Sequence, residues 1–322
     1  MAEANPESPL FHAFFTISFE NAAKASDREK FVALPDFTTV GDFFSVFLSA
    51  FFGKKFRNYG FLQTNGHYCI PDFAEIEPCR SRNTLPLNSK PRKDLAIDLN
   101  FHHAESLRPI FDSIFLEIDN GQRVSDDLEL AFTAGRFYLE ALNFFHTDPE
   151  MAYLNLVNAG EVLVSKLTYS EEDLFDEDFR KIFNEIEGKM GKKAMEKVRS
   201  RLFQVRRKFR IGLSRLISQP FFDGHECKES GFAIIRENFE SRMTAAYDLR
   251  SQFLHTGTRF GNWATILQQL NSEIGARPAY GSTEWKELIH RMPSLIGLER
   301  VIRFCLLRFI HQRVAPIHPK LE

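Results

Sequence analysis

The clearest hydrophobic pattern near the start of the chain lies between residues 43 and 52. The apolar positions have the spacing of one face of an α-helix, and they are Phe43, Phe44, Phe47, Leu48, Phe51 and Phe52. The pattern predicts a helix that buries this face in a core. A helix lying on a membrane surface would look the same, but the run is too short for a transmembrane span, which needs about 20 apolar residues.

The remaining patterns before residue 120 mix strand and helix. Two alternating or aromatic runs, at 10–20 and 95–101, predict strands, and Asn65-Gly66 between two apolar runs predicts a hairpin. Residues 104–118 have a helical pattern. We therefore expect residues 1–120 to form an α+β domain, whose role the sequence does not indicate.

Beyond Asn120-Gly121 only helical periodicity remains. A helix is predicted from Asp126 to about Phe145, and Asp148-Pro149 then predicts the start of another. We expect residues 125–316 to form an all-α domain, so the predicted fold is an α+β region followed by a helical bundle. The length of 322 residues agrees with about two domains.

Composition excludes several classes of protein. The net charge of −2 gives no overall attraction for nucleic acid or acidic membranes. The four cysteines include no Cys-x-x-Cys pair, which argues against disulfide-rich and zinc-binding modules. The first residues lack the features of a signal peptide, so we expect a cytoplasmic protein. Phosphate-binding glycine loops and the common hydrolase motifs are also missing.

Charge is nevertheless segregated within the helical part. Residues 171–178 are mostly acidic, whereas residues 197–215 are basic and predict one amphipathic helix with Arg199, Arg206 and Arg210 on a common sector. These arginines either form a solvated face that docks on the acidic segment or bind the phosphates of RNA.

Residues 232–257 predict a long helix that ends at Thr256-Gly257. One charge, Arg250, falls within its apolar stripe and therefore needs an acidic partner, a ligand or a subunit interface. The apolar members of this stripe are Ile235, Phe239, Met243, Ala246, Phe253 and Leu254. His255 falls in the last turn, where it is either an exposed terminal residue or an acid–base group. The spacing Arg-x4-His is weakly specific, since Arg313 and His318 repeat it around Pro316.

The string AAYDLRSQFLHTG resembles the Arg-x4-6-His segment of HEPN proteins, most closely the ApeA-like branch. NLVNAGEVLVSKL resembles the early helix of that family, with Glu161 at its acidic position, and LERVIRFCLLRFI resembles its closing helix. The resemblance covers about 190 residues, all in the C-terminal part. A subset of the family has a tyrosine where this chain has Gly257, which argues against the regulatory modification of that tyrosine.

The resemblance implies a homodimeric helical bundle that cleaves RNA without metal, in toxins or antiviral defence. His255 would be the acid–base group, Arg250 would bind the scissile phosphate, and Ser251 matches the polar residue after the family's arginine. Glu161 and Tyr247 would support this pair. RNA, a second copy of the chain and a neighbouring regulatory protein are the implied partners, with no membrane.

Two other functions stay open. The chain is alternatively a non-catalytic module that dimerises or binds nucleotide or RNA, or an enzyme for small molecules with its site in the N-terminal domain. His67, His102 and His103 suggest metal ligands only weakly, because neighbouring residues on a strand point to opposite faces. We expect no metal and no cofactor.

Overall fold

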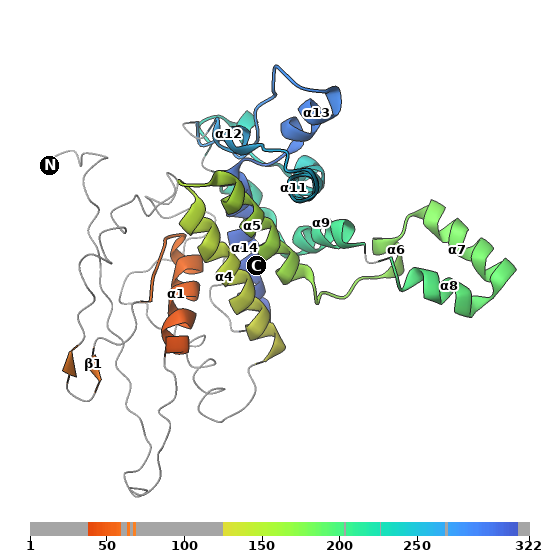
Figure 1. Cartoon of the computed structure of the whole chain (residues 1–322), viewed down its shortest axis with the longest axis horizontal. Helices are drawn as coiled ribbons and strands as arrows, with labels where there is room; N and C mark the ends of the chain where they lie inside the picture. Colours follow the sequence, from red (N-terminus) through yellow and green to blue (C-terminus); the bar gives the residue numbers. More distant parts are fainter. Residues whose placement is uncertain are drawn as a thin grey trace, which may run out of the picture.

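A computed structural model gives the fold and describes residues 38–58, 63–64, 67–68, 125–202, 204–225, 227–267 and 270–314. These residues form a helical bundle from which one helical arm projects (Figure 1). The predicted strands at 10–20 and 95–101 and the predicted helix at 104–118 lie outside the described residues.

The prediction of an α+β N-terminal region is wrong for the part that the structure describes. Its main element is helix α1 (Thr38–Phe52), as the spacing of the phenylalanines predicts. The predicted hairpin is present, but β1 (Gln63–Thr64) and β2 (His67–Tyr68) have two residues each and pair antiparallel. Such a short ladder cannot form the face of a layer, because a sheet needs several strands of about five residues to bury a core. The described fold is therefore all-helical in character.

Helix α14 (Leu295–Arg313) lies at the centre of the bundle, and its first thirteen residues are all buried. It is surrounded by α1, α4 (Asp126–Phe144), α5 (Pro149–Val164) and α9 (Val205–Leu216). A helix that is apolar around its whole circumference is expected to lie inside a protein. The three charged residues in this stretch must then find partners within the core.

The buried charges of α14 are paired with groups from several helices. Arg300 forms an ion pair of 2.7 Å with Glu273 and lies over the ring of Phe221. Tyr138 donates a hydrogen bond to Glu299 over 2.5 Å. Arg303 donates to the backbone carbonyls of Ala50 and Phe51 at the end of α1.

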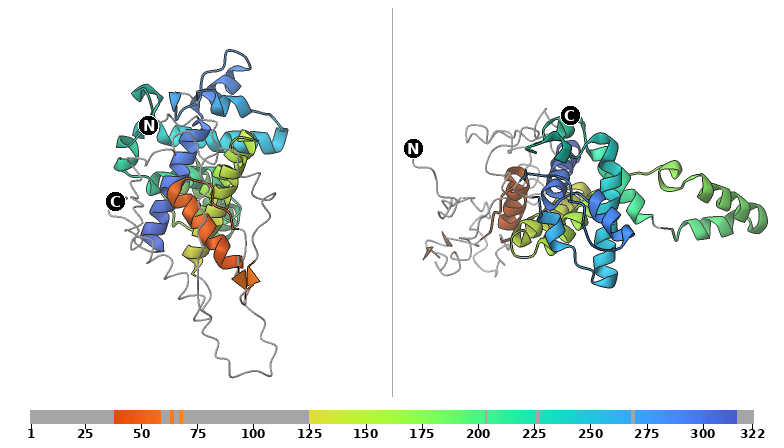
Figure 2. Two further views of the ribbon diagram at one scale, coloured as in Figure 1. Left: turned by 90° about the vertical axis from the view of Figure 1, so that its left-hand side faces the viewer. Right: turned by 90° about the horizontal axis from the view of Figure 1, so that it is seen from above.

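Helix α1 lies against the C-terminal helices (Figure 2). Its Phe43, Phe47 and Phe51 are almost fully buried in the same core. The Phe43 ring stacks on Phe132 of α4, with ring centroids 3.9 Å apart. Gly135 allows this approach, because a Cβ atom there would lie only 2.4 Å from Val46. The core-facing prediction for this helix is confirmed.

The starts of α4 and α5 follow the sequence signals closely. Ser125, one residue before the predicted Asp126, caps α4 by accepting a hydrogen bond from the N–H of Leu128. Asp148 caps α5, and Pro149 occupies its first turn as predicted.

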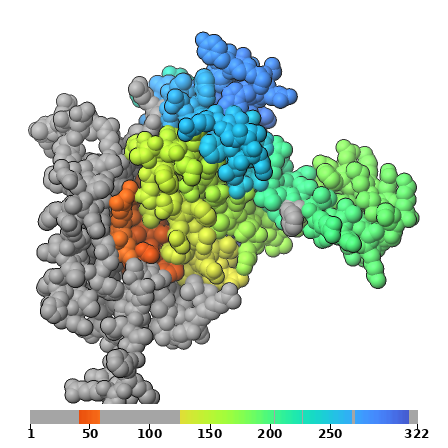
Figure 3. All heavy atoms as spheres, in the orientation of Figure 1, coloured from red at the N-terminus to blue at the C-terminus, as the bar shows by residue number. Residues whose placement is uncertain are grey.

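The arm consists of α6 (Glu171–Leu174), α7 (Glu177–Met190) and α8 (Lys192–Arg199), and it protrudes beside α9 (Figure 3). It has its own small apolar cluster, formed by Phe175, Phe183 and Met195. The single helix predicted for residues 197–215 is wrong, because the chain breaks between α8 and α9 at Gln204, whose φ is +47°. Leu202 packs in the arm and Phe209 in the main core, so one straight helix cannot bury both.

The segment between α9 and α14 completes the described fold. It comprises α10 (Gln219–Asp223), a short 3₁₀ turn (Ser230–Phe232), α11 (Arg236–Thr256), α12 (Gly261–Thr265) and α13 (Thr283–Arg291). Over the described ranges, every helix is too short or too polar to cross a bilayer.

Candidate functional site

Helix α11 carries the Arg-x4-His segment, and both of its ends are fixed by backbone interactions. At the start, Asn238 accepts a hydrogen bond from the N–H of Ile235. At the end, Gly257 adopts a left-handed conformation with φ of +68°, and its N–H donates to the carbonyl of Phe253. The predicted stop at Thr256-Gly257 is therefore confirmed, and it fixes the last turn that contains His255.

The buried face of α11 differs from the predicted stripe. Phe239, Met243 and Ala246 are buried as expected. Ile235 and Leu254, however, are 45% and 56% exposed. The core-facing side runs through other residues of the helix, namely Arg242, Ala245 and Leu249. Arg250 consequently lies at the edge of the core and not at its centre.

The acidic partner that Arg250 requires is Glu161 of α5. The two side chains form an ion pair of 3.0 Å and are only 23% and 20% exposed. The same Nη2 atom donates to Asn158 over 3.3 Å, and the guanidinium lies 5.7 Å from the centre of the Tyr247 ring. Arg250 Nε is buried without a hydrogen-bond partner among the described residues. The charge of Arg250 is therefore balanced within one chain, by an acidic partner and without a ligand or a subunit interface.

Burial and charge shift the acidity of the groups around Arg250. Burial raises the pKa of the Glu161 carboxyl above its ordinary value, although the Arg250 charge and a hydrogen bond from Tyr247 act against this. Burial, followed by the negative charge of Glu161, raises the pKa of the Tyr247 hydroxyl. Glu161 therefore takes up a proton more readily than an exposed glutamate does, and protonation would weaken its hold on Arg250.

His255 lies exposed in the last turn of α11, whereas Ser251 is half-buried. His255 lies five positions after Arg250 in the helix, which corresponds to a rotation of about 140° and a rise of about 7.5 Å. One chain therefore places the two predicted catalytic side chains on different sides of the helix.

The segment that follows His255 is anchored by Glu150, a residue that the sequence analysis did not single out. Its buried carboxylate accepts hydrogen bonds from the N–H groups of Phe260 and Gly261, and it pairs with Arg259 at 2.8 Å. Burial alone would raise the pKa of Glu150, but these interactions together hold it below the ordinary value. The only sequence signal was an acid in the first turn of α5, which is common at helix starts.

The three arginines predicted to bind RNA are paired with acids of the same chain. Arg199 pairs with Glu171 at 2.9 Å. Arg206 and Arg210 lie on α9 and pair with acids of α11, and the partners are Asp248 at 2.6 Å and Glu240 at 3.3 Å. The acidic partner predicted for this face, residues 171–178, thus holds only the first of the three. The remaining two pairs join α9 to the helix that carries the candidate site.

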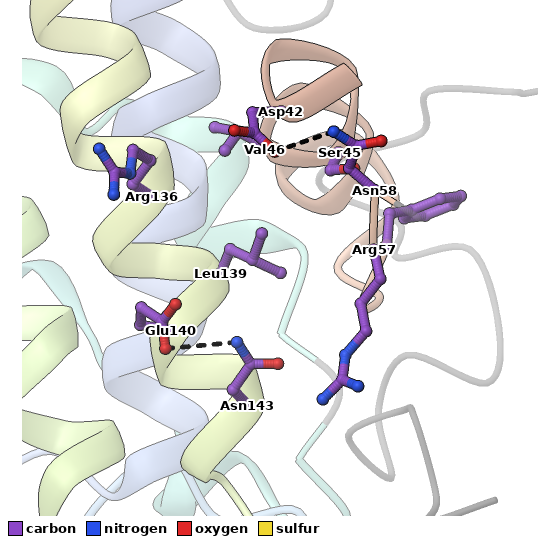
Figure 4. Close-up of a pocket in the computed structure, with 10 residues that line it drawn as sticks. Asp42, Ser45, Val46, Arg57, Asn58, Arg136, Leu139, Glu140 and Asn143 are labelled. Atoms are coloured by element: carbon purple, nitrogen blue, oxygen red, sulfur yellow. Dashed lines mark hydrogen bonds between the residues drawn. The ribbon is translucent and has the colours of Figure 1, made fainter. Parts of the chain in front are cut away.

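A separate polar pocket of about 230 Å³ lies between α1 and α4 (Figure 4). Its polar groups largely pair with one another, since Asn58 donates to Asp42 and Asn143 donates to Glu140. The lining includes neither Arg250 nor His255, and it has no histidine or cysteine. The pocket therefore lacks the usual acid–base and nucleophilic groups apart from its carboxylates and Ser45.

Within the described residues, His, Cys, Asp and Glu side chains form no cluster suited to a metal ion. Of the three histidines considered as weak candidates for metal ligands, His102 and His103 lie outside these residues, as does the side chain of His67. Comparison of the chain with protein-family models, with characterised proteins and with solved structures finds no match.

Proposed function

We propose that this chain is a metal-independent endoribonuclease of the HEPN type, whose cleft is completed by a second copy of the chain. The observation that carries the proposal is an exposed histidine in the last turn of α11, His255, beside the exposed Leu254 and about one and a half turns from Arg250. These are the residue types that cleavage of RNA without metal requires.

A second chain would solve the geometric problem of the single chain. Arg250 and His255 point to different sides of one helix, so neither can act on a phosphate held by the other within one α11. A two-fold axis near the end of α11 would bring the histidine of each copy toward the arginine of its partner. Leu254, which is 56% exposed, offers apolar surface for such a contact.

The proposed reaction uses the ribose as its own nucleophile. A neutral His255 takes the proton of the 2′-hydroxyl, and the 2′-oxygen attacks the adjacent phosphorus as the bond to the 5′-oxygen breaks. The leaving 5′-oxygen receives a proton from the second histidine. Arg250 stabilises the negative charge that develops on the phosphate. The products are a 2′,3′-cyclic phosphate and a 5′-hydroxyl end.

The ion pair between Arg250 and Glu161 sets a condition on this reaction. Glu161 holds the guanidinium in place before RNA arrives, and a phosphate must compete with the carboxylate for its donors. The raised pKa of Glu161 makes this exchange easier, because a protonated carboxyl competes weakly. Glu161 and Tyr247 are thus assigned to orienting Arg250.

The same ion pair also favours a second function, a dimerising or RNA-binding module without catalysis. A half-buried arginine paired with a half-buried glutamate satisfies the needs of a structural residue. In that case His255 would be a terminal residue without a chemical role.

Incubation of the full-length chain with RNA in the presence of a chelator separates the two functions. The His255→Ala variant should lose cleavage, and because His255 is exposed its stability should be unchanged. His290→Ala is the matched control, since His290 is an exposed histidine in the last turn of α13. An RNA with a 2′-deoxy residue at the cleaved position should resist. Full-length protein that binds RNA without cleaving it would favour the second function.

Dimerisation is tested at Leu254. Replacement by glutamate should yield a monomer in light scattering and abolish cleavage. Ile182, which is 50% exposed on the arm, gives the control, and Ile182→Glu should do neither. Phe253 is less suitable for this test, because its ring packs on Phe260 and a charge there would disturb the fold. An active monomer would rule out the shared cleft.

A further inference from the structure

The charges of the arm fall into two groups, one of which is neutralised within the chain. Where the arm meets the body, Arg215 pairs with Asp173 at 2.6 Å and Arg207 pairs with Asp176 at 3.4 Å. Arg199 similarly pairs with Glu171. The pairs of Arg215 and Arg207 fasten the arm to α9, whereas the pair of Arg199 lies within the arm, and all three arginines are already occupied.

The second group lies on the outer side of α8. Lys193, Lys197 and Arg201 follow one another at intervals of four residues, with Arg201 in the turn just beyond the helix. All three are exposed, and none forms an ion pair with another described residue. Lys193 and Lys197 each lie about 160° around the helix from Met195, which faces the apolar cluster of the arm. Their side chains therefore point away from the arm's interior.

The form of this surface suits a chain of phosphates. Successive positions are about 6 Å apart along the helix, so the three cations form a row and not a pocket. Exposed lysines act as hydrated point charges that contact phosphates without reading bases. A membrane surface is less well matched, because Met195 packs inside the arm and Val198, which is 42% exposed, is the one large apolar side chain that α8 presents to solvent.

The arm extends away from the bundle in Figures 1 and 3 and in the right-hand view of Figure 2, while α11 packs on α9 at its base. We propose that Lys193, Lys197 and Arg201 form a sequence-independent binding surface for the RNA backbone, outside the Arg250 and His255 site. The inference rests on the proposed function only in taking RNA as the polyanion. It assigns long RNA a second contact that a short oligonucleotide cannot reach.

The test measures binding and not cleavage. In the His255→Ala background, the triple variant Lys193→Gln, Lys197→Gln, Arg201→Gln should bind poly(U) more weakly than its parent. The slope of log affinity against log salt should fall by about 2, since each lost contact to a single strand contributes about 0.7. Glutamine preserves helix propensity, so the fold of α8 should remain.

The matched control removes three lysines from the same arm that already have acidic partners. Lys181 pairs with Asp178, Lys189 with Glu185 and Lys192 with Glu196, so their replacement by glutamine lowers the charge by the same amount. This control should change the salt slope little. An equal loss in both variants, or no loss in the first, would overturn the inference and leave room for an acidic protein as the partner of the arm.

The failure of this inference differs from the failure of the proposed function. With His255 intact, the triple variant of Lys193, Lys197 and Arg201 should cleave a short oligonucleotide at the normal rate and long RNA more slowly. Cleavage of both at normal rates refutes the arm surface alone. If the triple variant binds RNA more weakly but the unmodified chain does not cleave RNA, the ribonuclease is refuted and the arm surface is retained.

Discussion

At the scale of single residues, the half-buried Glu161 and the buried Glu150 should respond to pH in opposite directions. Glu161 has a raised pKa in the folded chain, so the folded state binds its proton more tightly than the unfolded state does. Its contribution to stability is complete below the ordinary glutamate pKa of 4.5 and is lost as the pH rises through the folded value. Glu161→Gln stays neutral, so it should gain stability relative to the natural chain between pH 4.5 and pH 7, as measured by urea unfolding.

Glu150 provides the opposite case. Its folded pKa lies below the ordinary value, so its contribution is complete above pH 4.5 and is lost as the pH falls through the folded value. Glu150→Gln should cost about 2 kcal/mol near pH 7, because hydrogen bonds to a charged group are among the stronger ones. The cost should shrink in acid. Parallel pH profiles for the two variants would contradict the assignment of their environments.

The sequence indicated that Arg250 needs a partner, because an apolar stripe cannot hold a lone charge. It could not show that Arg206 and Arg210 are paired. Which acids of α11 face α9 depends on how the two helices pack, and helical periodicity within each segment contains no information on that. Glu150 escaped notice for the same reason, since its partners are backbone N–H groups more than a hundred residues away.

At the scale of elements, the end of α11 should be more sensitive to substitution than its exposed position suggests. Gly257 has open space around it but a left-handed backbone, so Gly257→Ala should destabilise the chain by about 1 kcal/mol. Gly188 of α7 also has open space, and its backbone is helical. Gly188→Ala should therefore slow hydrogen exchange in α7. A neutral effect at Gly257 would mean that the last turn around His255 is not held by this cap.

Among the helices that the structure describes in the C-terminal part, the sequence located α4, α5 and α11, because caps and apolar spacing are local signals. The break between α8 and α9 could not be predicted, since the hydrophobic spacing continues through it. The break arises because Leu202 and Phe209 belong to two separate clusters. The turn signal at Asn65-Gly66 predicted the hairpin at the right place. The apolar runs beside it did not show that each strand has only two residues.

At the scale of the whole molecule, α1 ties the N-terminal region to the bundle. The proposed boundary between residues 1–120 and 125–316 remains a prediction, but α1 shares one continuous core with α4 and α14. Two arguments make this contact strong. Phe43, Phe47 and Phe51 together bury the surface of three large side chains, each contributing about 2 kcal/mol. Arg303, which is 4% exposed, has its guanidinium bound to the last carbonyls of α1.

A cut in the chain between residues 69 and 124 should therefore leave the two pieces associated. With a specific protease site engineered in this stretch, the fragment that contains α1 should co-elute with the C-terminal fragment after cleavage and dissociate only in denaturant. Phe47→Asp should release it, because the aspartate would bury an unpaired charge in the core. Phe52→Asp, at a half-buried position of the same helix, is the milder control. Free separation of the natural fragments would show that α1 is dispensable, and a C-terminal fragment that then stayed folded would establish residues 125–316 as an independent domain.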